Sequence, residues 1–212
     1  KDNMHLACIP SARTEQVVRD LNKFFPQYVA VPNILFTSFL DINAYVHPIS
    51  AILNAGRIEL TRGDYDFYWG GISPGVCANM EAIDRERLAI AKALGYEMVT
   101  LNELIHGYYG HPEWTSLFDF FSHSKVHGGS PEAKAPSTTR HRYITEDVPY
   151  GLVPMAEMAQ KVGVATPHMD AVITLASTFN GENYREMGRS LKNLGFADKN
   201  PEAIKRFILE GK

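Results

Sequence analysis

The sequence contains little cysteine: only Cys8 and Cys77 occur in 212 residues. The two lie far apart and outside any spacing typical of a metal site. So low a number favours a reducing compartment over a secreted fold held together by disulfides. We therefore expect a cytoplasmic protein.

A surplus of charge of one sign and long hydrophobic runs are also missing. The 21 Lys and Arg residues nearly balance the 24 Asp and Glu residues, so the formal net charge is −3. That balance provides no basic surface for nucleic acid. The longest apolar stretches, such as 34–40, are far too short to span a membrane, and no signal peptide is visible. We expect neither a nucleic-acid partner nor membrane association.

The first 33 residues have the pattern of a strand, a helix and a second strand. Residues 5–9 form a short apolar run that stops at Pro10, and apolar residues recur at helical spacing between Val17 and Phe25. Residues 28–31 read as the second strand. A single parallel crossover cannot form a stable sheet alone. We therefore interpret this leader as the end of a larger parallel sheet. The first residue is Lys1 rather than Met, which we take as a sign of a trimmed or fragmentary chain.

From about residue 38 the signals become helical, and we expect a mainly α domain. One helix is predicted at 81–94, and a second begins behind the capping box Thr100–Glu103. Further helices are predicted from about 149 to 162, at 167–179, at 184–194 and from Pro201 onwards. Residues 122–142 are rich in Ser, Gly, Pro, His and Lys, which predicts a long exposed loop. Our hypothesis is that this loop closes over a substrate.

The segment 43–59 contains a candidate for proton-transfer chemistry. Pro48 suits the first position of a helix, which would place His47 at its N-cap. Asn54 follows seven residues later and would project from nearly the same side. A histidine beside a carboxylate can transfer protons near neutral pH. The plainer interpretation, favoured by spacing alone, makes His47 a helix cap and Asn54 a surface residue.

A second polar segment, 140–151, follows the predicted loop. Arg142 offers a planar fork that matches a carboxylate. Glu146 and Asp147 would also suit the first turn of a helix for purely electrostatic reasons. Taken alone, that structural interpretation of the two acids is the stronger one.

The two segments together resemble the C-terminal helical domain of the opine dehydrogenases, the family of octopine and nopaline dehydrogenases. The resemblance is carried by His47-Pro48 with the following 53–59 (LNAGRIE), by 142–152 (RYITEDVPYGL), and by 166–173 (TPHMDAVI). It extends from the leader to about residue 196. It implies a helical domain like the C-terminal half of 6-phosphogluconate dehydrogenase, preceded by a βαβ remnant of a Rossmann domain.

The resemblance also implies a reaction and roles. Opine dehydrogenases condense an amino acid with a 2-oxo acid, such as pyruvate, and reduce the imine with NADH or NADPH. In this family a histidine exchanges the proton and an aspartate pairs with it; His47 and Asp147 match them. Arg142 holds the place of the arginine that grips a substrate carboxylate. We expect Asn54 beside the substrate or the nicotinamide.

One element of a working dehydrogenase is missing. The sequence has no G-x-G-x-x-G turn, since Gly70, Gly71 and Gly75 do not match that spacing. We therefore expect residues 1–33 to be the tail of a nucleotide-binding domain and 34–212 to be the helical substrate domain. On this interpretation the chain pairs with its own N-terminal Rossmann domain, leaves NAD or NADP mainly to that domain, and is inactive alone. A homodimer is also compatible with such a fold.

Three alternatives are open. His123 and His127 invite a metal site, but Gly128, Gly129 and Pro131 follow them and no H-E-x-x-H is present, so we expect none. A non-catalytic helical module for dimerisation or ligand binding could retain this scaffold. Dehydrogenases of 2-hydroxy acids or ketopantoate share the architecture but would rely on a lysine, and no lysine lies near either segment.

Overall fold

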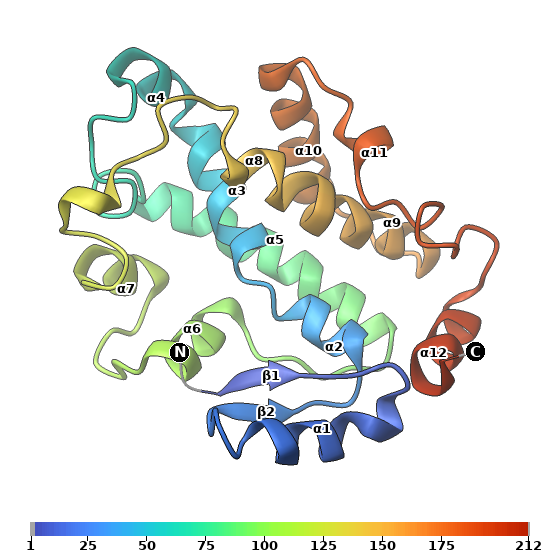
Figure 1. Ribbon diagram of the computed structural model, residues 1–212. Helices are drawn as coiled ribbons and strands as arrows, with labels where there is room; N and C mark the ends of the chain where they lie inside the picture. Colours follow the sequence, from blue (N-terminus) through green and yellow to red (C-terminus); the bar gives the residue numbers. More distant parts are fainter. Residues whose placement is uncertain (1–2, 212) are drawn as a thin grey trace.

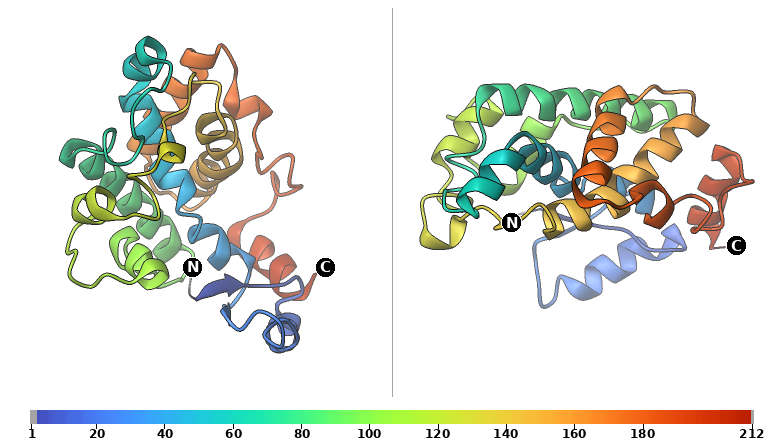
Figure 2. Two further views of the ribbon diagram at one scale, coloured as in Figure 1. Left: turned by 60° about the vertical axis from the view of Figure 1, so that its left-hand side comes forward. Right: turned by 90° about the horizontal axis from the view of Figure 1, so that it is seen from above.

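The computed structural model describes residues 3–211, and within them the chain is mainly helical with one two-stranded parallel sheet. Figures 1 and 2 show the sheet and α1 at one end of the molecule with α12 beside them, and most of the other helices stacked beyond. The leader comprises β1 (Met4–Leu6), the 3₁₀ helix η1 (Ser11–Arg13), α1 (Thr14–Leu21) and β2 (Tyr28–Ala30). The helical part begins with α2 (Ile34–Phe39), α3 (Asn43–Leu53), α4 (Ala55–Thr61), α5 (Pro74–Ala93), α6 (Leu101–Tyr109) and α7 (Leu117–His123). It continues with the 3₁₀ helix η2 (Pro131–Ala133), α8 (Arg142–Thr145), the π-helical turn η3 (Val148–Leu152), α9 (Val153–Lys161), α10 (Pro167–Asn180), α11 (Tyr184–Met187) and α12 (Pro201–Glu210).

The leader has the predicted strand–helix–strand order, with shorter strands. Met4 pairs with Tyr28 and Leu6 with Ala30 in parallel register. A sheet of two strands with three residues each is only marginally stable without packing against other elements. Side-chain bonds connect the leader to the helices: Asn33 donates to the Tyr96 hydroxyl at 2.9 Å while its own oxygen caps α2. The division between residues 33 and 34 stays a prediction.

The core lies where α3, α5, α9 and α10 pack together. Helix α3 is buried almost all round, from Ala44 to Ile52, as expected of a central helix. The buried carboxylate of Glu86 on α5 accepts backbone N–H bonds from His168 and Met169 at the start of α10. A negative charge at a helix N-terminus is favourable, so this contact orients α10 against α5. Cys8 and Cys77 are both free thiols.

Three local predictions were wrong. Pro48 lies inside α3, which begins at Asn43, so His47 is a mid-helix residue and not an N-cap. The burial of both flanks of Pro48 outweighs the preference of proline for a first turn. Helix α5 begins at Pro74, capped by Ser73, well before the predicted start at residue 81. The helix expected over 184–194 ends at Met187, because Gly188 adopts an extended conformation.

The segment 124–141 is not the wholly exposed loop that its composition predicts. Phe67 N–H donates to the Ala133 carbonyl and Ala135 N–H to the Tyr65 carbonyl, each at 2.8 Å. Ser124, Gly128, Ala135, Pro136 and Thr139 are buried. Residues 65–67 and 133–135 therefore form a short two-stranded contact that composition alone does not reveal.

Candidate functional site

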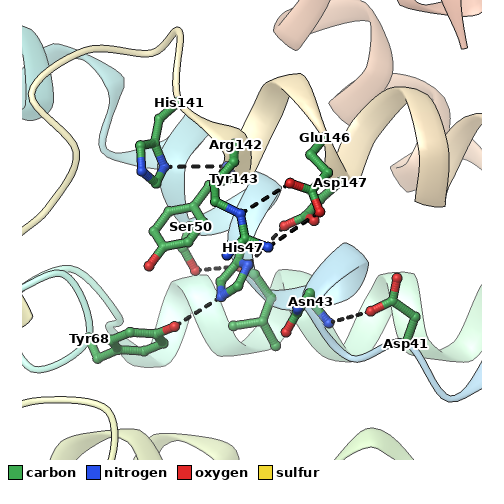
Figure 3. A network of polar contacts seen from close by, with 11 residues as sticks. Asp41, Asn43, His47, Ser50, Tyr68, His141, Arg142, Tyr143, Glu146 and Asp147 are labelled. Carbon is green, nitrogen blue, oxygen red and sulfur yellow. Dashed lines mark hydrogen bonds and ion pairs between the residues drawn. The ribbon is translucent and has the colours of Figure 1, made fainter.

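The site is centred on His47, whose two ring nitrogens both have partners. Nδ1 lies 2.8 Å from Asp147 Oδ2, and Nε2 lies 2.9 Å from the Tyr68 hydroxyl. Three separate segments supply these groups: α3, the turn before η3, and the loop that precedes α5 (Figure 3). The structure thus brings together two residues that stand 100 positions apart in the sequence.

This geometry determines how the hydrogens are arranged. His47 and Asp147 are both buried, at 8% and 6% exposed. A carboxylate can only accept, so Nδ1–H donates to Asp147. In a neutral imidazole Nε2 is then the acceptor, and the Tyr68 hydroxyl donates to it. An Asp–His pair of this kind fixes both the tautomer and the ring orientation.

Aromatic rings enclose the imidazole. Tyr143 stacks on His47 with ring centroids 4.0 Å apart and an interplanar angle of 26°. The Phe67 ring packs against both tyrosines, with its centroid 4.8 Å from that of Tyr143 and 5.2 Å from that of Tyr68. Burial raises the pKa of Tyr68 far above its ordinary value, and the neighbouring Tyr143 adds to the shift. Tyr68 therefore remains a neutral hydrogen-bond donor at physiological pH.

A cavity of about 170 Å³ lies against Tyr68 and Tyr143, the two tyrosines that contact His47. It is lined by Tyr68, Val126, His127, Ser130, Glu132, Ala133, Lys134 and Tyr143. The two tyrosines therefore touch both His47 and the cavity. The remaining lining comes from the segment 124–141, which places that segment over the site.

Arg142 lies in α8, on the same side of the structure as Asp147 but at the surface. Its guanidinium pairs with Glu146 through Nε at 3.1 Å and a terminal nitrogen at 3.3 Å. This pairing lowers the pKa of Glu146 and raises that of Arg142. Both side chains are more than half exposed, so the pair is weak and a ligand carboxylate could replace Glu146. The proposed role of Arg142 as a carboxylate anchor stays a prediction.

Asn54 has a structural role in addition to any functional one. It ends α3, and its side-chain amide donates to the carbonyls of Ser50 and Gly71, each at 2.9 Å. The second bond connects the end of α3 to the loop that carries Tyr68. Contact of Asn54 with a substrate or nicotinamide stays a prediction.

Sequence reasoning missed Tyr68 and Tyr143. Tyr143 lies next to Arg142 in the segment 142–152 that resembles the family, so its position in that segment could have indicated a role in the site. Tyr68 lies in residues 65–71, where no residue spacing indicates a functional site. The Tyr68 hydroxyl reaches His47 only because this loop folds back onto α3.

His141 provides a pH-dependent contact at the edge of the site. Its Nδ1 accepts the Tyr143 N–H at the start of α8, at 3.4 Å. Burial lowers the pKa of His141, and the positive charges of Arg142 and protonated His47 lower it further. The unfolded chain therefore binds this proton at a higher pH than the folded chain does. The associated stability is complete above about pH 6.5 and decreases as pH falls below it.

We expect His141→Asn to reduce this acid sensitivity, because asparagine keeps an N-cap acceptor and does not titrate. The measurement is the free energy of unfolding in urea at about pH 7.5 and about pH 5.5. The wild-type protein should lose more stability between these values than the variant. Equal losses in the two proteins would contradict the assignment. His5, whose pKa burial also lowers, contributes equally to both proteins and cancels in the comparison.

No group of three or more His, Cys, Asp or Glu side chains with a metal-binding arrangement occurs in residues 3–211. His127 Nδ1 lies 2.8 Å from the Ser124 hydroxyl, and His123 Nδ1 lies 2.8 Å from the Asp119 carbonyl. No helix in this part of the chain is both long and apolar enough to cross a membrane.

Comparison with known proteins places this chain in a family. Residues 30–180 match the family model described as NAD/NADP octopine/nopaline dehydrogenase, alpha-helical domain. An opine dehydrogenase of Arthrobacter sp. (strain 1C) is 35% identical over 208 residues, covering 98% of this chain and 56% of the relative. Protein ocs of Agrobacterium tumefaciens (strain Ach5) is 29% identical, covering 93% of this chain and 54% of the relative. The chain thus spans about half the length of the curated relatives it matches.

Solved structures agree on the fold. A structure of octopine dehydrogenase in complex with NADH and agmatine superposes with a TM-score of 0.66 at 20% identity, over 92% of this chain and 54% of the other. A complex with NADH and L-arginine gives a TM-score of 0.64 at 19% identity, with the same coverage. The mainly helical fold is therefore confirmed. From the extent of the family match and the identity to its members, this chain belongs to the octopine/nopaline dehydrogenase family and comprises its α-helical domain.

Proposed function

We propose that this chain is the substrate-binding part of an NAD(P)-dependent opine dehydrogenase, which condenses an amino acid with a 2-oxo acid such as pyruvate. The observation that supports this most directly is the buried pair formed by His47 and Asp147, 2.8 Å apart, whose hydrogen-bond partner Tyr68 lines a polar cavity. Membership of the family makes the reductive condensation the expected chemistry.

His47 would act as the proton donor and acceptor. Condensation passes through a carbinolamine, whose hydroxyl leaves as water only when it receives a proton. Protonated His47 carries that proton on Nε2, because Nδ1–H is held by Asp147. The Asp147 carboxylate stabilises the imidazolium and returns the ring to the same tautomer afterwards. Arg142, at the surface beside this pair, would hold a substrate carboxylate in place of Glu146.

In the proposed enzyme the nicotinamide cofactor would be bound mainly by residues outside this chain. A dinucleotide needs a glycine-rich turn that lets the backbone approach the pyrophosphate. The turn between β1 and α1, residues 7–13, contains no glycine, so it does not fit that role. A reduced nicotinamide, when bound, would supply the hydride. Consistent with this, the 212-residue chain alone should not catalyse the reaction.

The test uses the full-length parent protein that carries this chain. Oxidation of NADH and NADPH is followed with pyruvate and a panel of amino acids, for the wild type, for His47→Gln and for the exposed control His123→Gln. We expect amino-acid-dependent oxidation that falls by on the order of a hundredfold or more in His47→Gln only. A folded protein that binds the dinucleotide but shows no such oxidation would instead favour a non-catalytic dimerisation or ligand-binding module.

A further inference from the structure

We propose that Tyr68 is a proton relay, through which His47 exchanges its proton with the substrate. This inference rests on the proposed function. The Tyr68 hydroxyl lies 2.9 Å from His47 Nε2, and the same side chain lines the 170 Å³ cavity. His47 itself does not contribute to the described lining of that cavity. The phenol therefore stands between the imidazole and the space where a substrate would lie.

The hydrogen bonds run in one direction from the cavity to Asp147. Tyr68 O–H donates to His47 Nε2 in the neutral ring, and His47 Nδ1–H donates to Asp147. When His47 is protonated, Nε2–H donates to the Tyr68 oxygen, and the phenol hydrogen turns away from the imidazole, towards Tyr143 and the cavity that both tyrosines line. Protonation of the imidazole thus turns the phenol donor towards a substrate.

The proton transfer balances without any further reactant. As the carbinolamine C–O bond breaks, its oxygen takes the phenol hydrogen and leaves as water. The phenol oxygen takes the hydrogen from His47 Nε2, and the imidazolium becomes neutral imidazole. The nitrogen lone pair of the substrate forms the C=N bond. Tyr68 ends the step as the phenol it was at the start, so no free phenolate has to accumulate.

Tyr68 is held in place from several sides. Asp66 Oδ1 accepts the backbone N–H of Tyr68 at 3.0 Å, and its Oδ2 accepts the Gly129 N–H at 2.6 Å. Asn54 fixes the same loop through the Gly71 carbonyl. The Tyr68 ring stacks on Phe121 with centroids 5.8 Å apart and an interplanar angle of 22°. A ring confined in this way suits a fixed relay better than a side chain that swings away.

Tyr143 is the alternative phenol, since it also lines the cavity and its hydroxyl interacts with Tyr68. Its ring, however, stacks face to face on the imidazole, at 4.0 Å between centroids. A proton on a ring nitrogen lies in the ring plane and not above it. The oxygen that meets Nε2 is that of Tyr68, so Tyr68 is the relay.

The first experiment measures kinetics in the full-length parent protein. Tyr68→Phe removes one oxygen and keeps the ring. We expect kcat to fall by on the order of tenfold to a hundredfold or more, while KM changes by only a few-fold. The double variant with His47→Gln should lose little more than His47→Gln alone, because the two residues act as one unit. Tyr65→Phe is the matched control: it lies on the same loop, and its buried hydroxyl has no hydrogen-bond partner among the described residues.

A second measurement detects the contact itself, by NMR of the full-length parent protein labelled with ¹⁵N-histidine. The His47 Nε2 resonance should shift in Tyr68→Phe and stay in place in Tyr65→Phe, while the Nδ1–H signal persists in both. An unmoved Nε2 resonance would overturn the proposal. So would near-wild-type kcat in Tyr68→Phe beside an inactive His47→Gln, since Tyr68 would then only occupy the place of the substrate. If His47→Gln itself kept full activity, the proposed function would fail together with the relay.

Discussion

Replacement of Asp147 by asparagine, in the opine dehydrogenase that we propose to carry this chain, should lower kcat by on the order of 10²- to 10⁴-fold. The substitution preserves volume and shape at a position that is 6% exposed. What it removes is the negative charge 2.8 Å from His47 Nδ1. An active site that uses His47 as a general acid and base depends on that charge in two ways.

The first is the tautomer of the imidazole. If the asparagine N–H₂ group faces Nδ1, it donates to that nitrogen, and the proton moves to Nε2. Neutral His47 can then no longer accept the hydrogen bond from Tyr68. If the amide oxygen faces Nδ1 instead, the tautomer is retained, but nothing compensates the charge of the buried imidazolium. Either arrangement weakens proton transfer.

The control is Asp198→Asn, an exposed aspartate near the C-terminal end of the chain. The readouts are kcat and KM for amino-acid-dependent oxidation of the reduced nicotinamide, with the thermal midpoint measured beside them. We expect the control to match the wild type and Asp147→Asn to unfold within a few degrees of it. Retention of kcat within about threefold in Asp147→Asn would contradict an Asp–His pair that works by charge.

Replacement of Arg87 by methionine should destabilise the fold by about 3–5 kcal/mol. Arg87 is fully buried in α5, where its guanidinium binds Asp84 at 2.7 Å and the Phe39 carbonyl at 3.2 Å. A further nitrogen donates to the Val99 carbonyl at 2.5 Å. The residue therefore ties α5 to the end of α2 and to the segment that enters α6.

Most of this cost comes from the groups that Arg87 leaves behind. Asp84 would stay buried with only the Leu101 N–H as a described partner. The Phe39 and Val99 carbonyls would each lose the guanidinium as a donor. Arg85→Met is the matched control, because Arg85 lies two residues earlier, on the exposed side of the same helix. Urea unfolding should give a large loss for Arg87→Met and a change within about 0.5 kcal/mol for the control. A loss below about 1 kcal/mol in Arg87→Met would show that the carbonyls and Asp84 find other partners.

The sequence by itself determined the features that depend on neighbours along the chain. The Thr100–Glu103 capping box forms as predicted, and Asn200 accepts the Ala203 N–H ahead of Pro201 in the last helix. Such signals act over three or four residues, so local chemistry is sufficient to specify them. The parallel pairing of β1 and β2 can also be predicted from the sequence, because two strands joined by a helix are usually parallel neighbours in a sheet.

The family, too, could be identified from the sequence, because long matched segments preserve residue types that a shared fold requires. The resemblance placed Asp147 beside His47, and the structure joins the two. Local reasoning alone favoured Asp147 as a helix-start acid. It also misplaced Pro48, because the preference of proline for a first turn is a local rule that burial of α3 on all sides overrides.

Only the tertiary structure decided what meets His47 Nε2. Tyr68 lies on a loop with no regular period, and its position depends on Asp66, on the Asn54 amide at the end of α3 and on the segment 124–141. The burial of Arg87, a residue type that is rarely fully buried, is of the same kind. A contact between segments far apart in the chain leaves no pattern in the sequence of either segment, because the two residues that form it become neighbours only when the chain has folded.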